Sequence, residues 1–375
     1  MGVKYTLIDE CGFGDGHRRR LFDPLLNYIF CAMTNDRGGC GHYRSIFITQ
    51  GIQQLHENCF FVQLDSLSLH DPDILCECSS FRVQRLCSDK ELNWYVNYLL
   101  PARRQFGFRV LYDTDDILLG EDFPACNLWR ERFFGLADNL KTAMQGADLV
   151  TVTTPQLRDY YARRLNIPAS HFLVIPNYPP QAWADYYLPG EATQRFHRHR
   201  GRLRVGFCAS PSHFSVKEGE EVRDDLSQLA DWIIANRKRY QFVFQGGISN
   251  YLEPYRDDFE VHPYVRFLHY PRERQKLDLD LWICPLEDNE FNRCKSEIKL
   301  YEAWAGGIPV LVQRLPNYEA LAPEACFSTA EELAAKVEQM TASAESLEKI
   351  AADNYARMQG RWLEDHLEEW FKIML

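Results

Sequence analysis

Residues 291–313 combine side chains and backbone that suit a phosphate group. The loop carries Arg293, Lys295 and Ser296 up to the expected start of a helix, where free backbone N–H groups and a partial positive charge point outward. Glu302 follows six residues after Ser296, deeper in the helix, where a carboxylate can accept hydrogen bonds from the vicinal hydroxyls of a sugar. The types and spacing of these residues predict a cradle for a nucleoside diphosphate.

Three carboxylates, Asp113, Asp115 and Asp116, directly follow an apolar run. Acids clustered at a strand end can hold a divalent metal, act as a base or bind sugar hydroxyls. Their structural role would be to cap the next helix. We take Asp115 and Asp116 as candidate catalytic residues.

Two loops of small residues follow other apolar runs. The first, residues 34–44, contains Gly38 and Gly39 and ends in Arg44. Its glycines allow close approach of the backbone to a ligand, but they lack the G-x-G-x-x-G spacing of a dinucleotide site. The second loop carries Ser210, a candidate donor-binding residue, and His213, which could contact a phosphate or the transferred group, or be structural. We take His213 as a third candidate catalytic residue, and Gly38, Gly39 and Arg44 as candidates for the acceptor side of a cleft.

The densest positive charge lies in residues 195–204 and includes Arg198 and Arg200. Such runs are usually solvated faces or linkers, although they can also bind an anionic acceptor or a lipid surface. We include Arg198 and Arg200 among the candidate acceptor-side residues.

Short apolar runs alternate with longer helical patterns in both halves of the chain. This alternation predicts parallel sheets covered on both faces, an α/β fold with two Rossmann-like domains facing across a cleft. The predicted strands are 27–33, 59–64, 109–112, 148–153 and 171–175 in the first half, and 203–208, 240–244, 265–268, 279–284 and 308–312 in the second. Because ligands of such sheets bind at the carboxyl ends of strands, the loops named above are expected to meet in the cleft.

Breaks in this pattern set the expected boundaries. An N-terminal Rossmann-like, acceptor-side domain is expected over 1–190, a basic linker over 191–202 and a C-terminal nucleotide-sugar-binding domain over 203–340. The strongly helical composition of 341–375 predicts helices that cross back to the first half.

Composition excludes several classes of protein. With 46% hydrophobic and 25% charged residues, the 375-residue chain is typical of a globular protein of two domains. A net charge of −11 makes general coating of DNA improbable. No apolar stretch approaches the length of a membrane span, the first residues lack the apolar core of a secretory signal, and the twelve scattered cysteines suit reduced thiols. We expect a cytoplasmic protein without a transmembrane segment, in the host cytoplasm if it is phage-encoded.

Taken in order, the motifs resemble those of the family 4 type of retaining glycosyltransferase with the two-domain GT-B fold, and most closely a branch of bacterial and phage-encoded members. The resemblance covers most of the chain. It rests on the glycine-rich loop ending in Tyr43-Arg44 and on the runs 82–85, 112–116, 147–155, 174–177, 206–213 and 291–309.

This resemblance implies roles for two residues and exposes one departure. Glu302 matches the second glutamate of the family's E-x7-E motif, which binds the ribose of the donor, and Lys295 is implied to meet the pyrophosphate. The first glutamate falls on Cys294. Either Glu290 or Glu297 substitutes from a shifted loop, or backbone groups around Lys295 and Ser296 take over.

The implied activity is transfer of a sugar from a nucleotide-diphosphate donor to a hydroxyl of a glycan or lipid-linked acceptor, with retention at the anomeric carbon. Lys295, Arg293 and a helix N-terminus supply positive charge without a metal, so no cofactor is expected. A second possible acceptor is a hydroxylated base of phage DNA. The same architecture would also serve a nucleotide-sugar epimerase or hydrolase, or a non-catalytic nucleotide-sugar-binding protein.

Overall fold

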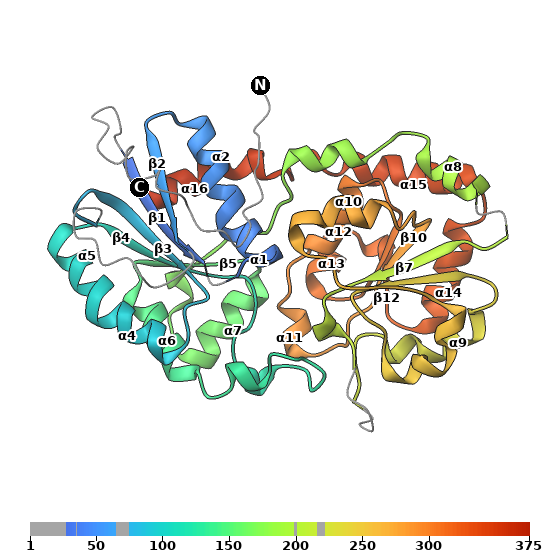
Figure 1. Cartoon of the computed structure of the whole chain (residues 1–375), viewed down its shortest axis with the longest axis horizontal. Coiled ribbons are helices and arrows are strands. Elements are labelled where there is room, and N and C mark those ends of the chain that lie inside the picture. Colours follow the sequence, from blue (N-terminus) through green and yellow to red (C-terminus); the bar gives the residue numbers. More distant parts are fainter. Residues whose placement is uncertain (1–27, 35, 65–74, 199–200, 216–221) are drawn as a thin grey trace.

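The computed structural model describes residues 28–34, 36–64, 75–198, 201–215 and 222–375. They form two α/β domains that lie side by side, each built on a six-stranded sheet with helices on both faces (Figure 1). Every strand pair in these residues is parallel. The predicted α/β fold with two Rossmann-like domains is therefore confirmed.

The N-terminal sheet has the strand order β2-β1-β3-β4-β5-β6. Its strands are β1 (Tyr28–Thr34), β2 (Cys59–Leu64), β3 (Cys78–Gln84), β4 (Arg109–Thr114), β5 (Leu149–Val152) and β6 (Phe172–Val174). Its helices are α1 (Gly39–Gly41), α2 (Phe47–Leu55), α4 (Asp89–Trp94), α5 (Leu100–Phe106), α6 (Ala137–Gly146) and α7 (Pro155–Leu165). Short π-helical segments, His42–Ile46 and Tyr95–Leu99, join α1 to α2 and α4 to α5.

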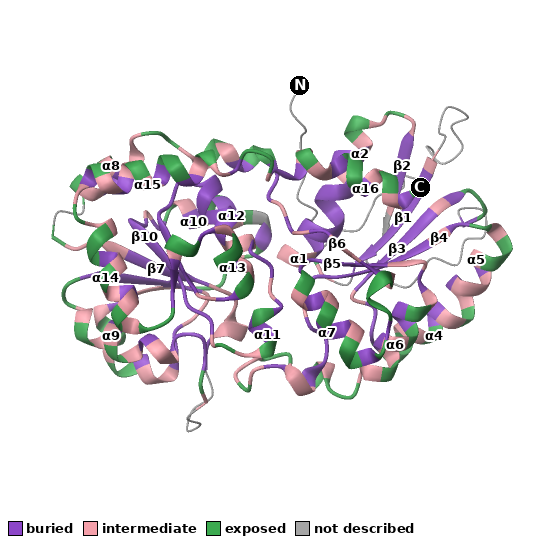
Figure 2. Ribbon diagram, turned by 180° about the vertical axis from the view of Figure 1, so that it is seen from behind, coloured by how far each residue is buried: buried purple, intermediate pink, exposed green. Residues whose placement is uncertain are grey.

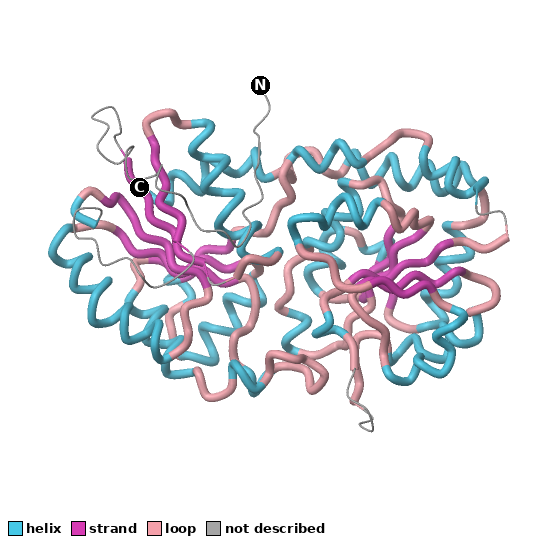
Figure 3. The backbone as a smooth tube through the Cα atoms, viewed as in Figure 1, coloured by secondary structure: helices cyan, strands magenta, loops and turns pink. Residues whose placement is uncertain are grey.

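The C-terminal sheet has the order β12-β11-β10-β7-β8-β9. Its strands are β7 (Arg204–Cys208), β8 (Gln241–Gln245), β9 (Glu260–His262), β10 (Leu281–Cys284), β11 (Val310–Gln313) and β12 (Cys326–Phe327). The helices of this half are α8 (Glu191–Arg198), α9 (Ala230–Asn236), α10 (Tyr270–Gln275), α11 (Glu290–Arg293), α12 (Ile298–Ala305), α13 (Pro316–Leu321), α14 (Ala330–Met340) and α15 (Ala344–Ala356). In Figure 3 both sheets stand between layers of helices.

Strands β3, β9 and β12 were not predicted, and one predicted strand is absent. The apolar criterion missed β3, a central strand in which Val83 lies opposite Met33 of β1 and Tyr112 of β4, because β3 buries polar side chains as well as apolar ones. The strand predicted over 265–268 is wrong. Phe267–His269 is a 3₁₀ turn that leads into α10, and the strand of this region is β9.

The last helix, α16 (Leu367–Met374), returns to the N-terminal domain and packs on α2. Trp370 of α16 is buried beneath two N-terminal guanidinium groups, with the Cζ atoms of Arg44 and Arg82 at 4.9 and 5.3 Å from its ring centre. One apolar cluster accordingly contains residues of α2, α12 and α16 and runs through both domains. Figure 2 shows this continuity as buried segments on the facing helices and strands of both halves.

The strand orders determine where a ligand can bind. In each sheet the strand order reverses at one point, so that the chain adds strands first to one side and then to the other. This switch point lies between β1 and β3 in the first sheet and between β7 and β10 in the second. Ligands of open parallel sheets bind outside the carboxyl ends of the strands at such a point. The loops after β1, β3, β7 and β10 are thereby positioned as a candidate site.

Candidate functional site

Two adjoining cavities lie between the domains at these strand ends. The first, of about 250 Å³, is lined by Lys295, Ser296, Lys299 and Glu302 and is called the donor cavity after the role predicted for these residues from the sequence. The second, of about 750 Å³, is the outer cavity, and it extends beneath residues 123–136 of the N-terminal domain. Seven residues line both: Gly39, Cys40, Asp116, Ser210, His213, Tyr264 and Lys295. A group at this junction can therefore face ligands in both cavities.

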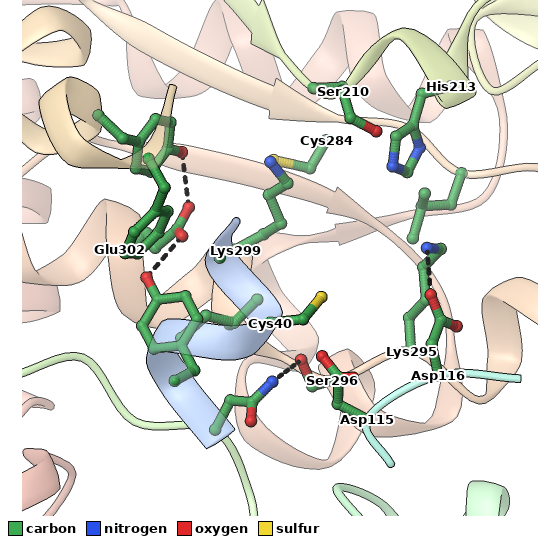
Figure 4. A pocket seen from close by; sticks show the side chains of 18 of the residues that line it. Cys40, Asp115, Asp116, Ser210, His213, Cys284, Lys295, Ser296, Lys299 and Glu302 are labelled. Carbon is green, nitrogen blue, oxygen red and sulfur yellow. Dashed lines mark hydrogen bonds and ion pairs between the residues drawn. The ribbon is translucent and has the colours of Figure 1, made fainter. Parts of the chain in front are cut away.

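Three side chains able to carry positive charge line the donor cavity. Lys295 has its Nζ 3.6 Å from Asp116 and 4.6 Å from the ring centre of Phe291. Lys299 donates from Nζ to the Cys208 carbonyl at 2.8 Å. His213 lies opposite them, as Figure 4 shows. Because cations stabilise phosphate oxygens strongly away from bulk water, this arrangement suits a diphosphate.

His213 is held by a buried carboxylate, with its Nδ1 2.5 Å from Oδ2 of Asp225. Burial lowers the pKa of His213, the hydrogen bond to Asp225 raises it, and the charges of Lys295 and Lys299 lower it further. The resulting pKa lies below the ordinary value for histidine. In the free protein the ring is therefore neutral at pH 7.

Glu302 lies on the donor cavity and is shared by two phenols (Figure 4). Its Oε1 accepts from Tyr43 of the N-terminal domain at 2.8 Å, and its Oε2 accepts from Tyr270 at 2.7 Å. Burial, followed by the negative charge of Glu302, raises the pKa of both phenols well above the ordinary value. The tyrosines remain donors, so the carboxylate is fixed in place by both domains.

Of the predicted acids, Asp115 and Asp116 line the donor cavity. Burial raises the pKa of Asp115, but the charges of Arg85 and Arg44 and the hydrogen bonds with Cys40 and Arg85 together leave that pKa below the ordinary value. Arg85 donates from Nε to Asp115 at 2.8 Å. Asp115 is therefore a charged, fixed acceptor, while Asp116 reaches across to Lys295.

The glycine-rich loop after β1 also reaches the site. Gly39 lines both cavities and Gly38 lines the outer one. A Cβ at Gly41 would lie 1.6 Å from the backbone oxygen of Asp36, so only glycine allows this turn. The π-helical segment that follows places Tyr43 against Glu302.

Three predicted site residues that the structure describes are not found at the cavities. Arg44 is fully buried and ion-pairs with Asp113 at 2.7 Å, because its guanidinium also bonds the Ile175 carbonyl inside the domain. Arg293 is half exposed and pairs with Asp288 at 2.6 Å, since it lies on the solvent side of α11. Arg198 pairs with Asp278 at 2.6 Å, because α8 packs along α15 and away from the cleft (Figure 1). Arg200 lies outside the described residues.

Cys294 is only 2% exposed and packs with Phe291 in an apolar cluster of the N-terminal domain. Its carbonyl accepts from Thr154 at 3.0 Å, so the residue belongs to the interface between the domains. Neither suggested substitute lines a cavity. Glu290 pairs with Arg163 at the surface, and the buried Glu297 bonds Tyr301 at 3.2 Å. Lys295 and Ser296 do line the donor cavity, and the role of their backbone groups stays a prediction.

Three of the polar residues that sequence reasoning missed in the donor cavity are Lys299, Asn177 and Tyr270. Lys299 was detectable, because it lies four residues after Lys295 and three before Glu302, the spacing of one helix side. Asn177, which donates to the Ser296 hydroxyl at 3.3 Å, comes from the N-terminal domain. Tyr270 follows a segment that was predicted as a strand. Local sequence carries no signal for these two long-range contacts.

Within the described ranges, no group of three or more His, Cys, Asp or Glu side chains is placed to hold a metal ion. None of the helices described is both long and apolar enough to span a bilayer.

Comparison with known proteins gives one family match. Residues 227–369 match the family model described as glycosyl transferase-like. This segment includes α9 to α15 and all of the donor-cavity residues between positions 285 and 302. No curated protein sequence matches the chain.

Solved structures match the whole chain at low identity. A glycosyltransferase from Rickettsia africae shares 11% identity, with 92% of this chain and 97% of that one covered and a TM-score of 0.58. Anabaena Alr3699/HepE, in complex with UDP and glucose, shares 13% identity over 93% and 100%, with a TM-score of 0.60. An alpha-glucosyltransferase in complex with UDP and a 13-mer DNA shares 10% over 92% and 98%, with a TM-score of 0.58.

At such identities the neighbours establish the fold of this chain. Both domains, their parallel sheets and the cleft between them correspond to the GT-B architecture. Together with the match over 227–369, they support a glycosyltransferase enzyme.

Proposed function

We propose that the protein transfers a sugar from a nucleoside diphosphate donor to a hydroxyl acceptor. The observation that carries this proposal is the convergence of Lys295, Lys299 and His213 on one cavity that also contains Glu302. The barrier to such transfer lies mainly in separating a diphosphate from an oxocarbenium-like sugar, so positive charge at the diphosphate is the strongest aid. The UDP complexes of a neighbouring fold favour UDP-sugars as the first donors to test.

Glu302 is proposed to bind the ribose. Each of its oxygens has one lone pair left after the bonds from Tyr43 and Tyr270. Vicinal hydroxyls can donate to those lone pairs. Lys295, Lys299 and His213 would then receive the diphosphate, with Ser210 and Ser296 as smaller polar contacts.

We propose that the acceptor enters through the outer cavity. Its lining combines aromatic side chains with charged ones, among them Trp129, Phe133, Asp36 and Arg85. Aromatic faces beside hydrogen-bonding groups suit a glycan or a lipid-linked sugar. Asp115 and Asp116 face the junction where the acceptor hydroxyl would meet the donor. Arg198 lies on α8, away from both cavities, so its expected place on the acceptor side loses its geometric support.

Retention at the anomeric carbon is proposed from the resemblance of the motifs to family 4. The anomeric configuration of the product, measured by proton NMR before mutarotation, tests it. An inverted product would contradict retention and leave the transferase activity standing.

The principal experiment supplies radiolabelled nucleotide sugars, beginning with UDP-glucose, alone and then with glycan, lipid-linked and hydroxymethylated DNA acceptors. Label should move only when an acceptor is present. Release or epimerisation of the sugar without acceptor would instead indicate a hydrolase or epimerase, and binding without turnover a non-catalytic protein.

The matched variant for this assay is Lys299→Met. A hydrogen bond to a charged group contributes about 1.5–3 kcal/mol, so transfer should fall about 10- to 100-fold. Lys276→Met is the control, because Lys276 is exposed and pairs with Glu273 outside both cavities. Equal activity of the two variants would remove Lys299 from the proposed diphosphate site.

A further inference from the structure

Asp225 is a buried carboxylate with partners from two other segments of the C-terminal domain. It is 5% exposed and lines the outer cavity. Oδ1 accepts from the Asn292 amide at 2.9 Å and from the Glu287 backbone N–H at 2.7 Å. Oδ2 lies 2.5 Å from Nδ1 of His213. One carboxylate therefore ties the loop after β7 to the loop that carries Lys295.

These contacts determine which nitrogen of His213 bears the proton. Oδ1 accepts from two N–H groups, and a carboxylate is an acceptor only. At 2.5 Å, Nδ1 must then carry the ring proton and donate this N–H as a hydrogen bond to Oδ2. In the neutral ring, Nε2 consequently carries a lone pair.

Nε2 faces the cavities rather than Asp225. The ring lines both cavities and its side chain is 16% exposed, and Figure 4 shows it pointing toward the space next to Ser210 and Lys295. The charged groups that act on this ring are Asp225 on its own side, and Lys295 and Lys299 from the opposite loop and helix. Asp116 of the N-terminal domain lies beyond Lys295.

We propose that Asp225 is a positioning residue that holds His213 as the Nδ1-protonated tautomer, so that Nε2 binds a proton when the donor's diphosphate enters the site. This inference rests on the proposed function for the identity of the ligand. The proton comes from solvent and returns to solvent when the nucleoside diphosphate leaves. No covalent bond of the protein changes.

Electrostatics gives the direction of this coupling. Without ligand, burial and the two lysines keep the pKa of His213 below the ordinary value despite Asp225. A diphosphate places negative charge beside Nε2 and offsets the lysine charges, so the pKa in the complex is higher. Binding is then tightest below the pKa of the free protein and weakens as pH rises through the pKa of the complex.

The first test reads the tautomer without any ligand. In protein labelled with ¹⁵N-histidine, the His213 ring should show the Nδ1–H tautomer at pH 7.5, with His213→Gln used to assign its signals. Asp225→Asn keeps acceptor capacity for Asn292 and Glu287 but presents an amide N–H to Nδ1. The ring should change to the Nε2–H tautomer. An Nε2–H ring in the unaltered protein would overturn the inference, whatever the enzyme's activity.

The second test measures protons taken up with inorganic pyrophosphate, by calorimetry in two buffers of different ionisation enthalpy. Pyrophosphate itself also takes up or releases protons, equally with both proteins. The difference in proton uptake between the unaltered protein and His213→Gln therefore measures the uptake by His213 alone. At pH 6.5 the unaltered protein should take up more protons than His213→Gln and bind pyrophosphate about tenfold more tightly. At pH 9 the two proteins should bind pyrophosphate equally. Asp225→Asn should behave like His213→Gln.

Glu260→Gln is the matched control, since Glu260 also bonds a histidine, His262 at 2.7 Å, away from both cavities. It should take up protons as the unaltered protein does. Asp225→Asn with unchanged uptake would overturn the positioning role. Failure to turn over any nucleotide sugar, with these results as expected, would count against the proposed function alone.

Discussion

At the scale of single residues, Glu302 has partners from both domains. Tyr43 and Tyr270 donate to its two oxygens, and Arg274 lies 3.9 Å away. Replacing the carboxylate by an amide puts an N–H₂ group where both neighbours are donors. Only the ribose is proposed to contact this side chain. The substitution should therefore weaken binding of a nucleotide without affecting binding of the diphosphate group alone.

Glu302→Gln should lower the affinity for UDP about tenfold while leaving the affinity for inorganic pyrophosphate unchanged. Titration calorimetry with both ligands measures the two affinities. Glu338→Gln is the control, because Glu338 also accepts from a tyrosine, Tyr240, but at the surface. Equal losses for UDP and pyrophosphate would contradict the ribose assignment.

Cys294 occupies the position of a glutamate in the family that the motifs resemble. Its side chain packs among apolar groups, and burial raises the pKa of its thiol to about 12. A carboxylate there would be buried close to Asp116 and Glu290, two further negative charges.

Cys294→Glu should therefore lower the free energy of unfolding by more than about 2 kcal/mol, without improving donor binding. Urea unfolding followed by circular dichroism measures the loss, with Cys294→Ala as the milder control. A stable Cys294→Glu protein that binds UDP-glucose more tightly would contradict this prediction, because it would show that the site can accommodate the glutamate.

Residue type and spacing identified much of the donor cavity, but not side-chain direction. Lys295, Ser296 and Glu302 were predicted and line it. Arg293 was predicted from the same loop, yet it turns to Asp288 at the surface. Arg44 was selected for its charge, and that charge is neutralised inside the domain by Asp113. A sequence does not show which charges have partners far along the chain.

At the scale of elements, sequence periodicity found most strands because they are short and apolar. It failed at β3, where buried Ser80, Arg82 and Gln84 interrupt the apolar pattern. Arg82 donates to the Ser45 carbonyl in the π-helical segment, and Gln84 donates to the Cys40 carbonyl in α1. Arg82 and Gln84, whose polarity kept β3 from being predicted, therefore help to position the glycine-rich loop.

The helix α16 allows a matched comparison of two tryptophans. Trp370 is 1% exposed under two arginines, whereas Trp129 is 52% exposed at the outer cavity. Trp370→Ala should cost about 3–5 kcal/mol of stability and Trp129→Ala no more than about 0.5 kcal/mol.

Urea unfolding measures the loss of stability in both variants. The transfer assay then compares their KM values. Trp129→Ala should raise the KM for the acceptor while leaving the KM for the donor unchanged. If the two variants were equally stable, α16 would not be an integral part of the N-terminal domain.

At the scale of the whole molecule, a chain of net charge −11 is proposed to bind an anionic donor. The charge is distributed unevenly, since Lys295 and Lys299 face the cleft between the domains. Asp115, Asp116 and Glu302 line the same cavity, so the positive side chains available to a diphosphate there are Lys295, Lys299 and, once protonated, His213.

Because side chains supply this positive charge, transfer should persist in EDTA. The rate with excess EDTA, compared with the rate after adding back magnesium or manganese, checks this expectation. Loss of transfer in EDTA with rescue by either ion would contradict it and would indicate a metal at the diphosphate.

The return of α16 to the first sheet has a consequence for biosynthesis. A ribosome delivers the residues of the N-terminal sheet first, but α2 and the guanidinium groups of Arg44 and Arg82 lack their cover until Trp370 has been made. The domain that begins the chain is therefore among the last parts to be completed. During translation, an apolar surface on it stays open while the whole C-terminal domain emerges, which makes this interval the one in which a chaperone would matter most.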